Sequence, residues 1–380
     1  MDALSGDEVR RLRARAQGLH GDGGGRTVAD TALLAGGLQA QDAKACRLQV
    51  RARSTGLTAP DVDAACAGRP PSVVRTWLMR GTLHAVAAED VRWLTALLGP
   101  RAADAYWGRR ARLGLDEDLC ARALTALERV LPGQALGRDV LVARLAGEGV
   151  VVDPGGQAPA HLLLYAAAHG VVCRGPEAEG DAATYVLADE WLDGVAGPDL
   201  SGDAAQAELA VRHAASYGPV SAADLARWAG IPLGAARRGQ AAAGERLTEV
   251  AGPDGPLLVA SARTGTAALP PRGAVRLTGH FDPYLLGYRD RDLMLPPAVA
   301  GRIATGGGFL MPCVLRDGAV VATWRHERRP SGLTVRVEPL GAEPDRALPD
   351  AALPDAIDAE VADLGRFLGL PARWEWASGR

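Results

Sequence analysis

The stretch VRHAASYGPVSAADLARWAGIPLGAARRGQAAA, residues 211–243, predicts two helices joined by a tight turn. Residues 217–219 (YGP) favour a turn before the first helix, because glycine and proline interrupt regular structure. Ser221 and Asp224 have the spacing of a capping box, in which a hydroxyl and a carboxylate satisfy the free amides at a helix start. Residues 230–232 (GIP) then end that helix. The stretch therefore predicts a helix-turn-helix, the clearest one in the chain.

Further capping boxes near the N-terminus predict helices that begin close to positions 6 and 28. These boxes are Ser5 with Glu8 and Thr27 with Asp30. Gly36 and Gly37 end the second helix, since glycine readily takes the left-handed conformation of a helix terminus. A third helix begins near Asp42. Residues 73–86 (VVRTWLMRGTLHAV) then read as two strands around Gly81, which gives the winged-helix order of helices followed by a hairpin.

The same order recurs in the middle of the chain. Residues 118–130, 138–147 and 160–168 have helical patterns. Short apolar runs follow at 171–173 and 185–187 and read as strands. A second winged helix is therefore expected before the helix-turn-helix of residues 211–243.

From about residue 270 the sequence becomes rich in strand patterns. Asp317 and Gly318 separate two apolar runs and are a pair favoured in tight hairpin turns. A second hairpin is expected to join residues 320–325 to 333–338 through a protruding basic loop, residues 326–332 (HERRPSG). An amphipathic helix is predicted over residues 354–368, followed by a last strand.

These patterns predict a helix-rich α+β fold with three tandem winged-helix modules and a C-terminal β-rich region. A chain of 380 residues has room for about two to four domains. The expected divisions are 1–115 for the first winged helix, 116–200 for the second, 201–268 for the third, and 269–380 for the β-rich region with the basic hairpin.

Charge and cysteine content exclude several classes of protein. The formal net charge of -3 argues against a protein that coats nucleic acid by bulk electrostatics, so any such contact needs a local basic face. The 5 cysteines are scattered and include no Cys-x-x-Cys pair, and no histidine pair has metal-ligand spacing. We therefore expect reduced thiols, no metal and no cofactor. No apolar run approaches the roughly 18 residues of a membrane span, so a cytoplasmic protein without membrane partners is expected.

Four segments, in order along most of the chain, resemble the AlkZ/YcaQ family of DNA glycosylases, which are winged-helix proteins that repair interstrand crosslinks. The segments are LQAQD at 38–42, WLMRGTLHAVAAEDVRWL at 77–94, FDPYLLGYRDR at 281–291 and DGAVVATWRHER at 317–328. The resemblance implies three winged helices and a barrel-like C-terminal region, arranged as an open C around duplex DNA. It also implies a monomer whose partner is double-stranded DNA bearing alkylated purines.

The resemblance places the active motif at Gln39 and Gln41, in the Gln-x-Gln branch, whose members act in self-resistance to DNA-alkylating natural products. Glutamine is a poor base, but a purine alkylated at N7 is cationic and leaves without being protonated. The amides then need only position a water and complement the charge of an oxocarbenium-like sugar. In an extended segment Gln39 and Gln41 lie on one side and would hold a water between them. The alternative from the residues alone is a polar turn whose amides cap backbone groups.

Other side chains are expected at the DNA interface or the lesion pocket. The predicted DNA contacts are Lys44, Arg47, Arg51, His84, Arg325, Arg328 and Arg329. The predicted lesion-pocket residues are Asp282, Tyr284, Arg289 and Arg291, for which an internal ion-pair network with a core tyrosine is an equal alternative. Likewise His84 is open to a structural role in the wing, and the basic loop to a solvated turn.

Three functions are consistent with this sequence. The favoured one is a monofunctional DNA glycosylase that removes N7-alkylated purines, including bulky adducts or crosslinks. A non-catalytic winged-helix regulator or resistance factor is the second, although such regulators are usually symmetric dimers of one module. The third is a bifunctional glycosylase in which Lys44, the single lysine, forms a Schiff base with the sugar. A phosphate-contacting role for Lys44 is preferred.

Overall fold

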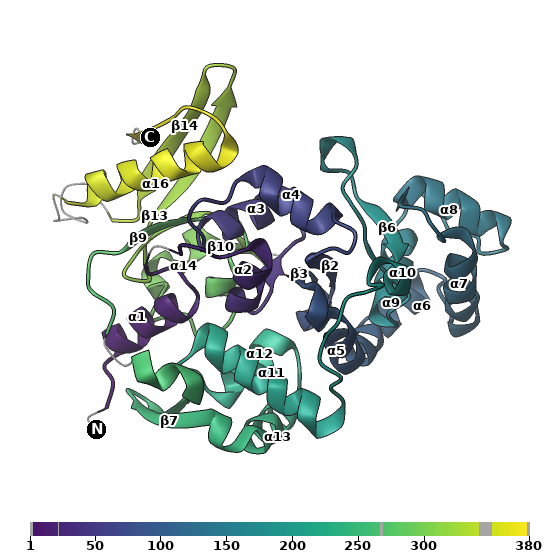
Figure 1. The fold of residues 1–380 in the computed structure, drawn as a ribbon, viewed down its shortest axis with the longest axis horizontal. Helices are drawn as coiled ribbons and strands as arrows, with labels where there is room; N and C mark the ends of the chain where they lie inside the picture. Colours follow the sequence, from purple (N-terminus) through teal and green to yellow (C-terminus); the bar gives the residue numbers. More distant parts are fainter. Residues whose placement is uncertain (1–2, 22, 267–268, 307, 342–351, 378–380) are drawn as a thin grey trace.

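The computed structural model describes residues 1–380 except 1–2, 22, 267–268, 307, 342–351 and 378–380 (Figure 1). Its first helices begin where the capping boxes predict. The hydroxyls of Ser5 and Thr27 accept hydrogen bonds from the backbone three residues on. Gly36 ends the second helix with a φ of 67°. The helices of this part are α1 (Gly6–Ala16), α2 (Val28–Ala35), α3 (Ala43–Arg51) and α4 (Ala59–Ala67).

A six-stranded sheet runs through the first half of the molecule. Its order is β1-β3-β2-β5-β6-β4, and β2 meets β5 through the single pair Arg75 and Arg174. The strands are β1 (Leu38–Gln39), β2 (Val73–Trp77), β3 (Leu83–Ala87), β4 (Leu136–Gly137), β5 (Val172–Arg174) and β6 (Thr184–Leu187). The two expected N-terminal modules therefore share one sheet.

Helices pack around this sheet, and α7 (Glu117–Val130), α8 (Arg138–Gly147) and α9 (Ala158–Ala168) lie where the apolar patterns predict. The others are α5 (Val91–Ala105), α6 (Trp107–Arg112) and α10 (Ala188–Trp191). A short 3-10 turn, η1 (Met79–Gly81), joins β2 to β3.

The helix-turn-helix of residues 211–243 is confirmed. Ser221 caps α12 (Ala222–Ala229), and Gly230 ends it with a φ of 74°. Around it lie α11 (Gly202–Tyr217), α13 (Leu233–Ala243) and the hairpin of β7 (Leu247–Gly252) and β8 (Gly255–Ala260). This is again the order of helices followed by a hairpin.

The C-terminal region is built on an open sheet, so the expected barrel-like form is wrong for the described residues. The strand order is β15-β14-β13-β12-β9, and its two ends, β15 and β9, do not pair with each other. The strands are β9 (Val275–Thr278), β12 (Cys313–Arg316), β13 (Ala319–Arg329), β14 (Gly332–Pro339) and β15 (Ala372–Trp376). Two short strands, β10 (Ala304–Gly306) and β11 (Phe309–Leu310), form a separate pair, and α14 (Pro297–Ile303) precedes them. The predicted amphipathic helix is α16 (Ala352–Leu368).

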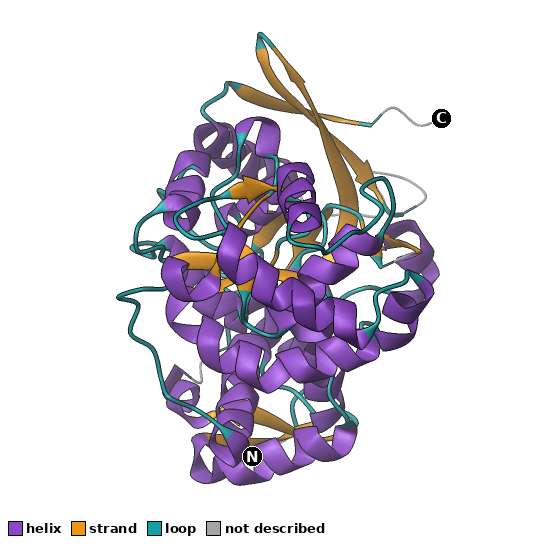
Figure 2. Cartoon of the chain, turned by 90° about the vertical axis from the view of Figure 1, so that its right-hand side faces the viewer, coloured by secondary structure: helices purple, strands orange, loops and turns teal. Residues whose placement is uncertain are grey.

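The second hairpin differs from the prediction in one respect. Residues 326–329 are strand, not loop, because β13 continues pairing with β14 as far as Arg329 opposite Gly332. Pro330 and Ser331 alone make the turn. The predicted loop of residues 326–332 is therefore corrected to a strand tip, and these long strands extend beyond the helical body (Figure 2).

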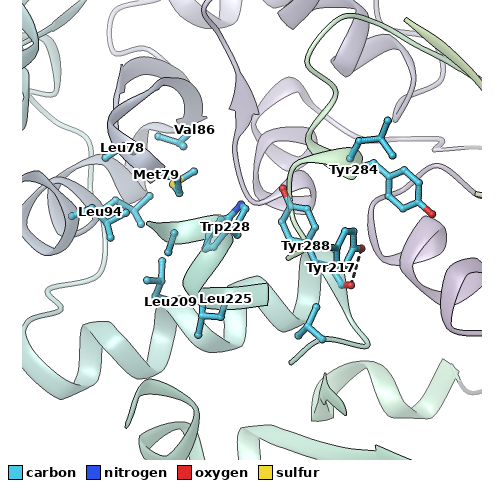
Figure 3. Close-up of a cluster of buried hydrophobic side chains, with 14 of the residues drawn as sticks. Leu78, Met79, Val86, Leu94, Leu209, Tyr217, Leu225, Trp228, Tyr284 and Tyr288 are labelled. Atoms are coloured by element: carbon cyan, nitrogen blue, oxygen red, sulfur yellow. Dashed lines mark hydrogen bonds between the residues drawn. The ribbon is translucent and has the colours of Figure 1, made fainter. Parts of the chain in front are cut away.

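One large core connects the parts of the chain that flank the Gln-x-Gln motif. It contains Met79 from the β2–β3 turn, Leu209 from α11, Trp228 from α12 and Tyr288 from the FDPYLLGYRDR segment (Figure 3). The Tyr288 hydroxyl donates to the carbonyl of Tyr217 at 2.9 Å. Because these residues are far apart in sequence, their packing fixes the first sheet, α12 and the C-terminal region against one another.

The described residues form neither a membrane-spanning helix nor a metal-binding cluster. No described helix is long and apolar enough to cross a membrane. In the same part of the chain, no group of three or more His, Cys, Asp or Glu side chains is arranged to hold a metal ion.

Candidate active site

The Gln-x-Gln motif lies in the short connection between α2 and α3. After Gly36 and Gly37 the chain extends into β1, where Gln39 pairs with His84 of β3. Gly37 has a φ of 96°, a backbone conformation that strongly favours glycine. Asp42 then begins α3 by accepting a hydrogen bond from the Ala45 amide. The motif thus begins at the end of the two-residue strand β1, Leu38–Gln39, and continues through the bend that leads into α3.

The two glutamine side chains are joined directly. The Nε2 atom of Gln39 donates to Oε1 of Gln41 at 2.8 Å. Gln39 is buried, with 4% of its surface exposed, whereas Gln41 is exposed. They lie on one side, as the extended backbone predicts. Because the amides are bonded to each other, the groups left to hold a water are the second lone pair of Gln41 Oε1 and its Nε2 donors.

A third glutamine, which sequence reasoning missed, fixes the backbone of Gln39. Gln49 of α3 is fully buried, and its Oε1 atom accepts a hydrogen bond from the backbone N–H of Gln39 at 2.9 Å. Its Nε2 atom donates to the Gln39 carbonyl at 3.0 Å and to the His280 carbonyl at 3.4 Å. In the sequence, the signal that could have identified Gln49 is a polar residue among the buried positions of α3.

Arg80 also contacts the motif and was not predicted. Its Nη2 atom donates to Oε1 of Gln39 at 3.3 Å, and its Nη1 atom donates to the carbonyl of Trp228 at 2.5 Å. Arg80 has a φ of 57°, a left-handed conformation that is uncommon outside glycine. This backbone conformation directs the Arg80 guanidinium from the β2–β3 turn toward Gln39. The guanidinium in turn orients the Gln39 side-chain amide, whose oxygen faces Arg80 and whose nitrogen faces Gln41.

His84 is on the sheet beside Gln39 but does not face solvent. It is 3% exposed, and its Nδ1 atom donates to the Thr82 carbonyl at 2.8 Å. Burial, with the nearby charge of Arg80, lowers the pKa of His84 to about 3. A buried neutral imidazole does not contact phosphates, so we remove His84 from the expected DNA contacts and assign it a structural position behind Gln39.

The basic residues of α3 have three different surroundings. Lys44 is exposed. The Arg47 guanidinium contacts Asp63 at 2.7 Å, Glu177 at 3.1 Å and Asp181 at 2.6 Å. Burial alone would lower the pKa of Arg47, but Asp181 and Asp63 outweigh it and raise the pKa. These ion pairs occupy Arg47, which leaves its expected phosphate contact without support in this structure.

Arg51 lies one turn after Arg47 on α3 and is buried. Its side chain is 2% exposed and pairs with Glu360 at 2.8 Å and Asp363 at 2.7 Å, both on α16. A guanidinium in this position cannot reach DNA. We therefore reassign Arg51 from DNA contact to the interface between α3 and the C-terminal helix.

The three hairpin arginines are exposed and lie on two faces of β13. Alternation places Arg328 on the face of His326, and Arg325 and Arg329 on the other. Trp324, which shares the face of His326, lies in one buried cluster with Leu48 of α3, so the Arg328 face is the one turned toward α3. Burial, His280 and Lys44 lower the pKa of His326. Arg329 pairs with Glu327 at 2.9 Å.

The FDPYLLGYRDR segment is mainly structural. Asp282 is buried and binds Arg53 at 2.6 Å and 2.9 Å, and the Tyr284 hydroxyl donates to the Gly318 carbonyl at 3.0 Å. These two residues form the internal network that was the alternative to a lesion pocket. Arg289 is exposed, and Arg291 is partly exposed.

Known proteins resemble this chain in sequence and fold. The solved structure of DNA glycosylase AlkZ from Streptomyces sahachiroi superposes with a TM-score of 0.80 at 25% identity, covering 98% of this chain and 100% of that one. A curated relative from the same organism, an interstrand DNA cross-link repair glycosylase, is 27% identical over 299 residues, 76% of this chain and 79% of the relative. The fold and the site therefore define a DNA N-glycosylase. The model of the DNA glycosylase AlkZ-like family matches residues 33–367, and the chain belongs to that family.

Proposed function

We propose that this DNA glycosylase is monofunctional and hydrolyses the N-glycosidic bond of N7-alkylated purines, including bulky natural-product adducts and interstrand crosslinks. The observation that carries the proposal is the bonded amide pair of Gln39 and Gln41. Among the described residues, the side chains hydrogen-bonded to the Gln39 side-chain amide are Gln41 and Arg80, and neither is a carboxylate. The site therefore suits a substrate whose leaving group needs no proton.

In this mechanism the alkylated base leaves as a neutral molecule and a water attacks the sugar carbon. Gln41 is exposed and presents an acceptor oxygen and amide donors, so it holds the water and complements the developing charge. Gln39 is buried and acts on Gln41, because its Nε2–H group fixes the orientation of that amide. Neither glutamine removes a proton in the transition state as a strong base would.

Exposed basic side chains on α3 and on the hairpin support DNA binding. Lys44 follows Gln41 on α3, and the hairpin supplies Arg325, Arg328 and Arg329. We assign these four to phosphate contacts. The exposed position of Lys44 in a solvated helix surface favours that role over Schiff-base chemistry, for which a desolvated amine is better suited.

The wider organisation belongs to the same proposal. We infer three winged-helix modules, residues 1–115, 116–200 and 201–268, followed by residues 269–380, acting as a cytoplasmic monomer that surrounds duplex DNA as an open C. The relative from Streptomyces sahachiroi repairs interstrand crosslinks, and we propose self-resistance to an alkylating natural product as the cellular role. The order of helices and hairpins supports the module count.

The proposal is tested by base release from a duplex with a single N7-alkylguanine, with borohydride present in a parallel reaction. The expected result is release of the alkylated base with an intact abasic strand and no trapped complex. A borohydride-trapped complex that Lys44→Ala abolishes would show the lyase mechanism instead. Binding without release, from this duplex or from a bulky-adduct duplex, would contradict the proposed substrate.

A further inference from the structure

Three arginines from distant parts of the chain are brought together around α12, and one of them, Arg80, contacts Gln39. Arg80 comes from the β2–β3 turn, Arg227 from α12 and Arg291 from the segment after Tyr288. Arg227 is exposed, and Arg80 and Arg291 are partly exposed. We call these three side chains the arginine cluster.

Backbone contacts on both sides of Arg227 build the cluster. On one side, the Arg80 guanidinium donates to the Trp228 carbonyl at 2.5 Å, and a Cβ atom on Gly230 would lie 3.0 Å from the Arg80 Cα atom. On the other side, the Arg289 amide donates to Asp224 at 2.9 Å. Because α12 is thus bound at both ends, the β2–β3 turn and the chain leading to Arg291 are held against it.

The cluster has no counter-charge among the described residues. None of its three guanidinium groups forms an ion pair there, whereas Arg47, Arg51 and Arg53 are each paired with carboxylates. The nearby Asp224 carboxylate does not neutralise the cluster, since it accepts a hydrogen bond from the Ser221 hydroxyl and forms an ion pair with Arg13 at 3.7 Å.

Burial and the repulsion between the positive charges of the cluster both lower the pKa of Arg80 and of Arg291. Burial lowers the pKa of Arg80, and the positive charges of Arg227 and Arg291 lower it further. Burial and Arg227 lower the pKa of Arg291 in the same direction. Like charges held together by the fold destabilise the empty protein and favour binding of an anion. Guanidinium forks match the oxygen geometry of a phosphate group.

We propose that the arginine cluster is a binding site for a backbone phosphodiester of duplex DNA, next to the nucleotide whose base is removed. This inference rests on the proposed function, because it uses the position of Gln39 as the reacting site. Arg80 belongs to both, through its hydrogen bond of 3.3 Å to Gln39 Oε1. A phosphate bound by the cluster is therefore separated from the amide pair by the Arg80 side chain alone. Binding through the DNA backbone positions the damaged nucleotide whatever the size of its adduct.

The test is the double variant Arg227→Ala/Arg291→Ala, which changes two solvent-accessible members and leaves Arg80 in place. Affinity for an undamaged duplex is measured over a range of salt concentrations. Loss of one phosphate contact reduces the slope of log K against log salt by about one and weakens binding several-fold. Removing repelling charges leaves Tm equal or raised. The matched control is Arg122→Ala on α7, an exposed arginine far along the chain, which keeps the wild-type slope.

A double variant with the slope and affinity of the control would overturn the phosphate site. So would a lowered Tm with an unchanged slope, which would show that the arginines are structural. Undamaged DNA keeps this test separate from the chemistry. A wild-type protein that binds with the expected slope but releases no alkylated base would contradict the proposed function and leave the phosphate site standing.

Discussion

Gln39 donates a hydrogen bond of 2.8 Å from its Nε2 atom to Oε1 of Gln41. Arg80 determines the direction of this hydrogen bond, because it donates to the oxygen of the Gln39 side-chain amide and leaves the Nε2 atom to donate to Gln41. The two glutamines are therefore not equivalent. Gln41 presents its amide to solvent, and Gln39 positions it from a buried site.

Replacing either glutamine by alanine should reduce the single-turnover rate of base release. Removal of one preorganised donor in comparable sites lowers the rate about 10²- to 10³-fold. We expect the larger loss for Gln41→Ala, since Gln41 is the exposed member of the pair. Affinity for undamaged duplex should stay near wild type. Gln134→Ala, at an exposed position outside the motif, is the control and should keep the wild-type rate.

Glutamate variants test the direction of the hydrogen bond. In Gln41→Glu, the new carboxylate still accepts the hydrogen bond from Gln39 Nε2. In Gln39→Glu, the donor is replaced by a carboxylate oxygen, which would face Gln41 Oε1, so the hydrogen bond is lost. Gln41→Glu should therefore retain more base release than Gln39→Glu. In the latter, the new carboxylate would pair with Arg80. Equal rates for the two variants, or the reverse order, would contradict the assigned bond direction.

Asp282 should contribute to stability and not to the lesion pocket. Its carboxylate binds Arg53, whose side chain is fully buried at 0% exposure. Asp282→Asn leaves that guanidinium without its counter-charge, which in buried pairs costs about 3–5 kcal/mol of unfolding free energy. Urea unfolding measures the loss. Single-turnover base release by the folded fraction should keep its rate, and a rate loss without destabilisation would instead support the pocket role.

The stability of the protein should depend on His84 below neutral pH. Burial lowers the pKa of His84 to about 3 from the usual 6.5, so between these values the unfolded state binds more protons. Stability from this residue is complete above about pH 6.5 and is lost as the pH falls toward 3, by at most about 1.4 kcal/mol per pH unit. His84→Asn keeps a donor for the Thr82 carbonyl and should flatten this slope in urea unfolding. The control His169→Asn changes an exposed histidine and should leave the slope unchanged.

The hairpin arginines should differ in their importance for DNA binding. Arg328 shares the face of His326 that is turned toward α3, whereas Arg329 is on the other face and is paired with Glu327. Arg328→Ala should therefore weaken duplex binding and lower the salt slope by about one, and Arg329→Ala should have a smaller effect. Equal effects on binding would mean that DNA contacts both faces of the hairpin.

Sequence patterns located most elements because their signals are local. Ser221 and Asp224 predicted the start of α12, and Asp317 with Gly318 predicted the turn between β12 and β13, where their φ angles are 49° and 79°. The extent of β13 was missed. His326 to Arg329 look like loop residues by composition, but their pairing with β14 is a long-range contact that composition does not encode.

The sequence by itself determined the helix boundaries, the turns and the position of Gln39 and Gln41 between two helices, because each depends on residues within a few positions of one another. Only the tertiary structure decided which charges are neutralised. Arg51 is paired by Glu360 on a helix more than 300 residues away, and Arg80 reaches Gln39 only because α12 holds its turn in place. Burial and the supply of counter-charges are properties of packing between distant segments. A basic residue close to the motif in sequence, such as Arg51, can therefore be buried in ion pairs, whereas a basic residue outside the motif, Arg80, contacts Gln39.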